Sequence, residues 1–202
     1  MPFDFSKYEL YTSCESVYCY ENSNILINKL DIRDNFTLKN AETEITILKL
    51  KLLAENNVTG RFTPTHLKNI HKFIFEDIYP FAGKYRTEQI GKSNTWFYPP
   101  NIIDESVKKL LDKLKAEKNL QNLHRTDFVD RLSYYMAELN AIHPFREGNG
   151  RTVREFIRQL ALFNGYELDW SLCEKDNILQ ASILSYDDYT TLEPVLSQCL
   201  SQ

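Results

Sequence analysis

The stretch HPFREGNGRTVR, residues 143–154, joins two segments that have helical periodicity. After it, apolar residues recur every three or four positions from Val153 to Leu160, and the pattern ends at the helix-stop signal Asn164–Gly165. Before it, the same spacing extends over residues 128–139. We therefore expect two helices joined by a loop that begins at residue 143, the second helix opening near residue 150 and ending at residue 164.

Most of the remaining chain also has helical periodicity. Residues 38–53 and 103–114 repeat apolar side chains every three or four positions. Thr63 followed by Pro64 is an N-cap with proline in the first turn, which opens a helix that runs to about residue 77. From about residue 177 the pattern indicates one or two short helices. Within 38–53, the side chains expected to face the core are Ile45, Leu48 and Leu52.

One stretch breaks the helical pattern. In GKYRTEQIGKSNTWFYPP, residues 83–100, β-branched and aromatic residues lie on both sides of the turn-forming residues 91–94, and two prolines close the segment. We expect a short β-hairpin that projects from a helical body. No internal repeat or flexible linker marks a second domain, so the sequence predicts one mainly α domain over residues 1–202.

The composition excludes several classes of protein. Of the 202 residues, 43% are hydrophobic and 26% charged, which is a globular and not a disordered composition. The net charge of −4 argues against direct nucleic-acid binding, which needs a basic surplus. The sequence has no apolar run of the roughly 18 residues that span a membrane, and its first residues lack the pattern of a signal peptide. We expect a cytoplasmic protein without a membrane partner.

The loop at 143–154 has the features of an anion-binding site. Gly148 and Gly150 allow positive φ angles, so successive backbone N–H groups can point at one ligand, and the following helix adds its positive N-terminal end. Arg151 and Arg154, three residues apart, lie on one helix face and can both reach a phosphate chain. Glycine turns also occur in ordinary loops, so the argument depends on the combination of residues.

Two further residues of the loop suggest catalysis. Glu147 offers the carboxylate that Mg²⁺ takes from a protein when it also binds nucleotide phosphates. His143 is the residue type whose unperturbed pKa suits a general base near neutral pH. Phe145 is expected to point into the core and fix the loop. Each residue alone also fits a structural role, since a histidine at a helix end is often a capping residue.

This loop resembles the signature of the Fic family, HxFx(D/E)GNGRxxR. The matching positions are His143, Phe145, Glu147, Gly148, Asn149, Gly150, Arg151 and Arg154. The similarity extends over about residues 15–200, including VYCYENSNILINKLDI at residues 17–32. The resemblance implies a Fic-type helical bundle with a short β-hairpin flap, in which residues 83–100 are the flap and residues 143–164 the motif loop and helix.

The activity implied by the resemblance is protein adenylylation, the transfer of AMP from ATP to a Tyr, Ser or Thr hydroxyl of a target protein with release of pyrophosphate. In that reaction His143 would take the hydroxyl proton, and Glu147 would hold the Mg²⁺ cofactor between the α- and β-phosphates. The residues implied for phosphate binding are Gly148, Asn149 and Gly150 for the α-phosphate, and Arg151 and Arg154 for the β- and γ-phosphates.

The flap would align a segment of the target by strand addition and leave the hydroxyl beside the base. The flap residues implied are Lys92, Ser93, Asn94, Thr95 and Trp96. Family analogy names subunits of the type II topoisomerases, DNA gyrase and topoisomerase IV, as targets to test.

Other activities of the same scaffold stay open as alternatives. One is transfer of another phosphate-containing group, although phosphorylating members of the family depart from the Gly-Asn-Gly turn that this chain keeps. Another is a non-catalytic interaction module, which predicts loss of His143, Glu147 or an arginine. A third is removal of AMP, which in the family uses a glutamate from the inhibitory motif (S/T)xxxE(G/N).

The inhibitory motif also bears on regulation. The glutamates followed by Asn or Gly are Glu21, Glu55 and Glu147, and none has a Ser or Thr four residues before it. We therefore expect a toxin whose small antitoxin supplies the inhibitory glutamate in trans, with a translocated effector as the alternative.

Overall fold

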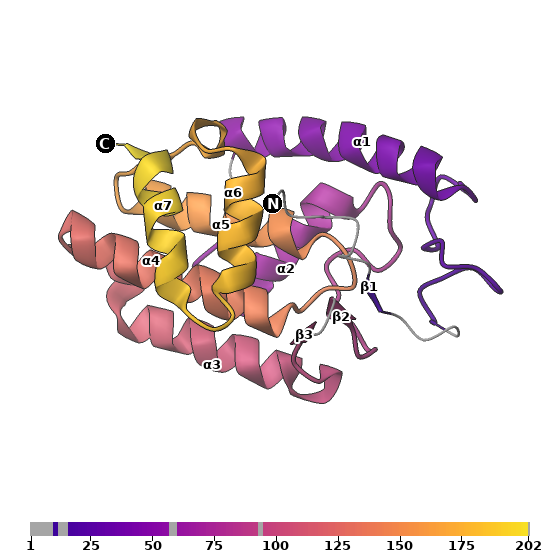
Figure 1. Cartoon of the computed structure of the whole chain (residues 1–202), viewed down its shortest axis with the longest axis horizontal. Helices are drawn as coiled ribbons and strands as arrows, with labels where there is room; N and C mark the ends of the chain where they lie inside the picture. The colour runs from indigo at the N-terminus through magenta and orange to yellow at the C-terminus, as the bar shows by residue number, and fades with distance from the viewer. Residues whose placement is uncertain (1–9, 12–15, 57–59, 93–94, 202) are drawn as a thin grey trace, which may run out of the picture.

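The computed structural model describes residues 10–11, 16–56, 60–92 and 95–201. Within these ranges the fold is mainly α-helical, as predicted (Figure 1). The helices are α1 (Asn35–Glu55), α2 (Pro64–Phe75), α3 (Ile103–Ala116), α4 (Arg125–Ile142), α5 (Asn149–Phe163), α6 (Lys175–Leu184) and α7 (Glu193–Cys199). The strands are β1 (Leu10–Tyr11), β2 (Gly91–Lys92), β3 (Thr95–Trp96), β4 (Glu167–Leu168) and β5 (Leu200–Ser201). Short 3-10 turns lie at Pro100–Ile102, Lys118–Leu120, Trp170–Leu172 and Tyr189–Leu192.

Helices α4 and α5 form the centre of the bundle. They pack on each other, α2 covers α5, and both α3 and α7 pack on α4. Phe128, Leu132, Phe156 and Leu160 are fully buried at this centre. In Figure 1, α6 and α7 lie across the bundle near the viewer, while α1 and α3 run along opposite edges. The loop between α4 and α5 therefore starts and ends on the two most buried helices.

Helix boundaries follow the capping signals of the sequence. Thr63 caps α2, its side chain accepting a hydrogen bond from the His66 N–H, as predicted, although the helix ends at Phe75. Helix α5 ends at Phe163, and Gly165 has a φ of 82°, the left-handed conformation expected of a C-terminal glycine.

The expected inner face of α1 is wrong at two of its three positions, whereas Ile45 is partly buried and packs against the core. Leu48 and Leu52 are 61% and 48% exposed, and the residues of α1 that are buried are Leu38, Thr46 and Leu53. Helix α1 lies at the edge of the bundle and packs mainly on α2, so a narrow stripe of it is covered (Figure 1). The covered face of α1 also includes polar contacts with Arg151, described below, which apolar periodicity does not reveal.

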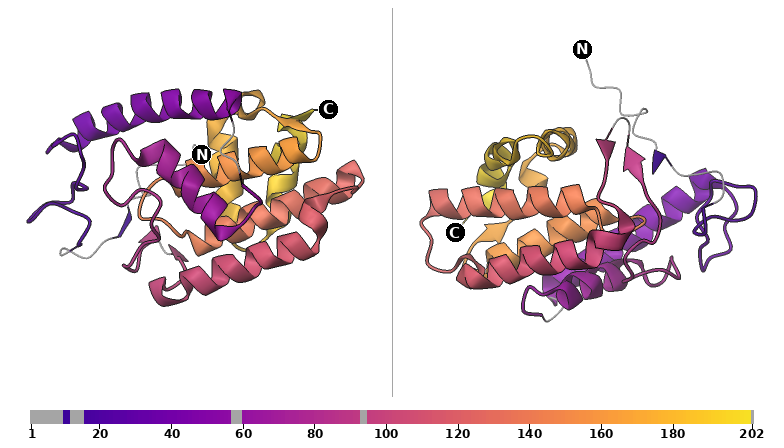
Figure 2. Two further views of the ribbon diagram at one scale, coloured as in Figure 1. Left: turned by 180° about the vertical axis from the view of Figure 1, so that it is seen from behind. Right: turned by 90° about the horizontal axis from the view of Figure 1, so that it is seen from below.

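The predicted hairpin is present, with a third strand that the sequence did not predict. Strands β2 and β3 pair antiparallel, and β1 pairs with the outer edge of β2, giving the order β1-β2-β3. The strands project from the helical body (Figure 2). Trp96 in β3 is 61% exposed. Ser93 and Asn94, which follow β2 in the sequence, lie outside the described residues.

A second small sheet near the C-terminus was also not predicted. Strands β4 and β5 pair antiparallel and connect the chain after α5 to the chain after α7. Among the helices in the described ranges, none is long and apolar enough to cross a membrane.

Candidate active site

The loop between α4 and α5 is anchored in the core by aromatic stacking. Phe145 is fully buried, as predicted, and its ring stacks on His71 of α2 with centroids 3.9 Å apart. The Asn149 side chain closes the loop, since its Oδ1 accepts from the Phe145 N–H at 2.8 Å and its Nδ2 donates to the Phe145 carbonyl at 2.7 Å. Both polar atoms of that amide are thus used inside the loop, which leaves Asn149 its backbone N–H for binding a phosphate.

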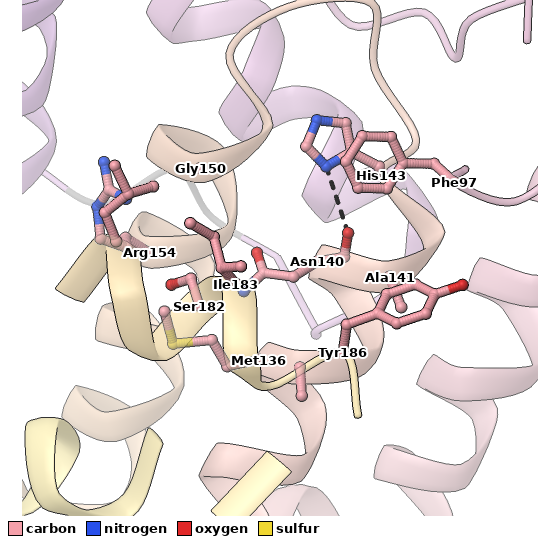
Figure 3. A pocket seen from close by; sticks show the side chains of 12 residues that line it. Phe97, Met136, Asn140, Ala141, His143, Gly150, Arg154, Ser182, Ile183 and Tyr186 are labelled. Carbon is pink, nitrogen blue, oxygen red and sulfur yellow. Dashed lines mark hydrogen bonds between the residues drawn. The ribbon is translucent and has the colours of Figure 1, made fainter. Parts of the chain in front are cut away.

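His143 ends α4 in a left-handed conformation, with φ 49° and ψ 61°. Its Nδ1 lies 3.3 Å from the Asn140 carbonyl. Because a carbonyl oxygen only accepts, Nδ1 carries a proton in this contact, and in the neutral ring the lone pair that a general base needs is then on Nε2. The ring also stacks on Phe97, just after β3, with centroids 3.8 Å apart (Figure 3). The imidazole is therefore oriented by α4 on one side and by the hairpin on the other.

The glycines of the turn have different roles, contrary to the expectation that both use positive φ. Gly148 has a φ of 79°, and a Cβ there would lie 2.1 Å from the Phe75 ring, so only glycine fits. Gly150 is helical, and a Cβ there would lie 3.2 Å from Nη1 of Arg154. Gly148 thus permits the turn, whereas Gly150 leaves room for the Arg154 guanidinium.

Glu147 lies at the N-terminus of α5. Its Oε1 accepts a hydrogen bond from the Gly148 N–H at 2.8 Å and lies 3.5 Å from Nη2 of Arg151. In the part of the chain that the structure describes, no group of three His, Cys, Asp or Glu side chains is arranged to hold a metal. One partly exposed carboxylate still fits Mg²⁺, since this ion is commonly bound by one or two carboxylates together with phosphates and water.

Arg151 is engaged by α1. Its guanidinium pairs with Glu42, donates to Thr46 Oγ1 at 3.2 Å and lies over the Phe75 ring. Glu42 also accepts a hydrogen bond from the Tyr79 hydroxyl, and the pKa of Tyr79 is raised by burial and by this carboxylate. Glu42 is a site residue that the sequence analysis missed, because one glutamate among the charged residues of α1 has no local signal.

Arg154 has no such counterion. It makes no hydrogen bond or ion pair with any residue in the described ranges, although it is largely enclosed. Burial, with a smaller effect of the nearby Arg151 charge, lowers the pKa of Arg154 to about 10. The group remains cationic at neutral pH, and no carboxylate among the described residues pairs with it.

Arg154 lines a cavity of about 200 Å³. Its walls come from α4, the start of α5, α6 and the end of the hairpin, and His143 lies on one side of it (Figure 3). Most of the lining is apolar or aromatic, with Phe97, Met136, Ile183 and Tyr186 among its members. Asn140 also lines the cavity, and its Nδ2 is buried with no hydrogen-bond partner among the described residues.

Comparison with known proteins shows the family of this chain. Residues 61–161 match the Fic/DOC family model. The chain belongs to the Fic/DOC family. It is 39% identical over 176 residues to "Protein adenylyltransferase VbhT" of Bartonella schoenbuchensis, covering 87% of this chain and 37% of VbhT, so it spans about a third of that relative. It is 34% identical to "Probable protein adenylyltransferase Fic" of Escherichia coli, covering 92% of both chains.

The fold agrees with solved Fic structures. The N-terminal Fic domain of a VirB-translocated Bep effector protein from Bartonella quintana, with bound ADP, superimposes with a TM-score of 0.84 and 27% identity over 91% of this chain and 94% of that chain. The expected Fic-type helical fold is thereby confirmed.

The sequence-predicted residues of the Fic loop come together around the N-terminus of α5, but a further histidine supports them. His71 Nδ1 accepts from the Gly83 N–H at 2.8 Å, which requires Nε2 to donate to the Glu147 carbonyl, 3.0 Å away. Burial lowers the pKa of His71 to about 4, so it stays neutral. The sequence analysis missed this role because His71 lies 72 residues from His143, with no motif around it.

Proposed function

We propose that this chain transfers AMP from ATP to a side-chain hydroxyl of a target protein and releases pyrophosphate. Protein adenylyltransferase is the activity named for its relatives in Bartonella schoenbuchensis and Escherichia coli, and this activity class was the one expected from the sequence. The observation that carries the proposal is Arg154, a guanidinium that shares a cavity with His143 and pairs with no carboxylate in the described ranges. A cation held in this way is suited to an anionic substrate.

The cavity suits the adenosine part of ATP. Phe97 and Tyr186 provide aromatic surface, and the Asn140 amide has an unused donor. An asparagine side chain can pair with the N6 and N7 edge of adenine, whereas guanine offers two acceptors there. We expect ATP to bind in preference to GTP, with the preference reduced in Asn140→Leu.

The phosphates would bind at the N-terminus of α5. The first N–H groups of a helix lack intrahelical partners and lie at its positive end. Asn149 and Gly150 contribute these N–H groups, and Arg154 contributes charge-assisted donors. The Gly148 N–H is donated to Glu147 Oε1, so Gly148 would contribute by permitting the turn. Arg151 is already paired with Glu42. It would therefore contribute to phosphate binding through the part of its positive charge that Glu42 does not offset.

Glu147 and the nucleotide phosphates would hold Mg²⁺. When bound, the ion would neutralise charge that develops on the leaving pyrophosphate. Oε1 of Glu147 accepts from the Gly148 N–H, which places the carboxylate at the anion end of α5. This arrangement fits a single protein ligand to a nucleotide-bound metal.

His143 would act as the base. Its Nε2 accepts the proton of the target hydroxyl, the oxygen attacks the α-phosphorus, and the bond between that phosphorus and the bridging oxygen to the β-phosphate breaks. The electron pair of that bond leaves with pyrophosphate. The Nδ1 contact with the Asn140 carbonyl would stabilise the imidazolium that forms.

The hairpin would dock the target, with Lys92, Ser93, Asn94, Thr95 and Trp96 as its flap residues. Strand β1 lies on the outer edge of β2, so a target strand would have to replace it or add beside β3. We expect Trp96→Ala to slow protein modification and leave ATP affinity nearly unchanged, because this side chain is exposed on the hairpin and absent from the cavity lining.

Regulation in trans is consistent with the unpaired state of Arg154. No acidic side chain among the described residues pairs with it, which leaves it available to a glutamate from a small antitoxin. A cytoplasmic location and a type II topoisomerase subunit as target complete the proposal. Adding a purified small protein that carries the inhibitory motif (S/T)xxxE(G/N) should inhibit AMP transfer by the wild-type chain.

One experiment separates AMP transfer from the alternatives. ATP labelled at the α-phosphate should label the target protein, and ATP labelled at the γ-phosphate should not. Label from the γ-position alone would instead indicate phosphorylation, and no label from either would indicate a non-catalytic module.

A further inference from the structure

Arg86 is a buried cation outside the Fic motif. It precedes the hairpin strands, its residue is 2% exposed, and its guanidinium contacts no carboxylate that the structure describes. Burial lowers the pKa of Arg86 to about 10. Enclosing a cation without a counter-charge is costly, so its hydrogen bonds must account for its presence.

Every hydrogen bond of the Arg86 side chain is donated to a backbone carbonyl. Nε donates to the His143 carbonyl at 2.9 Å, and Nη2 donates to the Ile142 carbonyl at 3.3 Å. Nη1 donates to the Glu88 carbonyl at 2.8 Å, and Nη2 also donates to the Tyr98 carbonyl. One planar group therefore joins the end of α4 to both sides of the hairpin base.

The backbone reinforces the same connection. The Arg86 N–H donates to the Pro144 carbonyl at 2.9 Å, so three consecutive residues, from the last residue of α4 into the motif loop, accept from Arg86. His143, the central one, has the left-handed φ of 49° that side chains rarely adopt. Such a conformation persists when surrounding contacts hold it. The hydrogen bond from Arg86 Nε to the His143 carbonyl is one of these contacts.

We infer that Arg86 is a positioning residue that fixes the His143 backbone and couples the hairpin to the catalytic base. The inference rests on the proposed function, in which the hairpin docks the target and His143 takes its proton. Arg86 does not line the cavity, so it would act on the alignment of base and target hydroxyl and not on nucleotide binding. Holding several carbonyls at once requires the planar, fixed set of donors of a guanidinium. Lysine keeps the positive charge but lacks this set of donors.

Arg86→Lys tests this inference, and Arg125→Lys is a matched control. Nη2 of Arg125 also donates to two backbone carbonyls, those of Ser197 and Leu200, at 3.1 and 2.9 Å, but at the C-terminal end of the bundle. Each variant is assayed for ATP affinity, for the rate of AMP transfer to target, and for the NMR signals of the His143 ring. The chain has four histidines, so His143→Ala assigns the signal.

We expect Arg86→Lys to lower the transfer rate about tenfold to a hundredfold, because small displacements of a catalytic group have effects of that size, with ATP affinity changed less than about threefold. The His143 ring signals should shift in Arg86→Lys and stay in place in Arg125→Lys. Equal transfer rates in the two variants, or a parallel loss of ATP affinity and transfer in Arg86→Lys, would overturn the inference.

Two further provisions keep the test decisive. If Arg86→Lys is unstable, saturating ATP restores the folded population by mass action, and slow exchange of the Arg86 Nε–H in the wild type provides a second readout. Fast exchange of that proton contradicts the inference.

If the wild-type chain transfers no AMP, the proposed function fails, while the His143 ring signals in Arg86→Lys and Arg125→Lys still decide the role of Arg86.

Discussion

Arg154→Met should separate the stability of this protein from its affinity for ATP. The Arg154 guanidinium is enclosed, has no counterion among the described residues, and has its pKa lowered to about 10 from an ordinary 12.5. At neutral pH the group is charged in both the folded and the unfolded state, so the lowered pKa is an unfavourable contribution to folding of up to about 3 kcal/mol. Methionine keeps most of the apolar stem and removes that charge.

Without ATP, the free energy of unfolding of Arg154→Met should therefore stay unchanged or rise by about 1–2 kcal/mol. ATP should stabilise the variant less than it stabilises the wild type. Charge-assisted hydrogen bonds contribute about 1.5–3 kcal/mol, so ATP affinity should fall about tenfold to a hundredfold. At an ATP concentration of about 100 times the wild-type Kd, ATP stabilises the wild type by about 2.7 kcal/mol and the variant by only about 0.4–1.4 kcal/mol.

Urea unfolding with and without ATP and Mg²⁺ measures both quantities. Arg125→Met is the control, since Arg125 donates to the Ser197 and Leu200 carbonyls far from the cavity and should lose stability while keeping the full effect of ATP. If Arg154→Met keeps the full ATP effect, or loses as much stability as Arg125→Met without ATP, Arg154 is a structural residue and the reasoning fails.

Four other variants or conditions test separate parts of the site. Gly148→Ala should destabilise the protein by at least about 2 kcal/mol in urea unfolding, because its φ is 79° and the new Cβ would meet the Phe75 ring; an unchanged midpoint would contradict the turn geometry. Glu42→Gln should cost about 2 kcal/mol by removing the nearer of the two carboxylates beside Arg151, and an equally stable variant would mean that the Glu42–Arg151 pair contributes nothing. The pKa of His71 is about 4 when folded and 6.5 ordinarily, so only the unfolded state takes up the proton as pH falls through this range. Stability should then decrease by up to about 3 kcal/mol between those values, less so in His71→Gln, and a flat profile would refute the neutral histidine. Glu147→Ala should raise the Mg²⁺ concentration needed for transfer, and an unchanged metal titration would remove Glu147 from the metal site.

The motif loop could be predicted from the sequence because its signals are local. His143, Phe145 and Gly148 lie within six positions, and the C-terminal glycine of α5 at Gly165 is also a local stop signal. Helix periodicity similarly located α4 and α5, since both bury a regular apolar face.

The residues that support the loop could not be predicted in this way. Glu42, His71 and Arg86 act across distances of 57 to 109 residues in the sequence, and each contacts the loop through a bond that depends on tertiary packing. The inner face of α1 was misassigned at Leu48 and Leu52. The covered face of this helix includes the contacts of Glu42 and Thr46 with Arg151, which apolar spacing does not reveal.

The role of Asn149 also needed the structure. The motif gives the residue type, but only the folded loop shows that its amide bonds to both backbone groups of Phe145. The third strand β1 pairs residues 10–11 with residues 91–92, a long-range pairing for which two residues carry no recognisable pattern.

The most direct test of the central claim is AMP transfer by the purified chain and by its His143→Ala variant, each given α-labelled ATP, Mg²⁺ and target protein. The wild type should place the label on a target hydroxyl and release pyrophosphate, with no other protein added. The variant should bind ATP with nearly the wild-type affinity but transfer it about a hundredfold to ten-thousandfold more slowly. Transfer by His143→Ala at the wild-type rate would contradict the account, as would a wild-type chain that binds ATP but never modifies a protein.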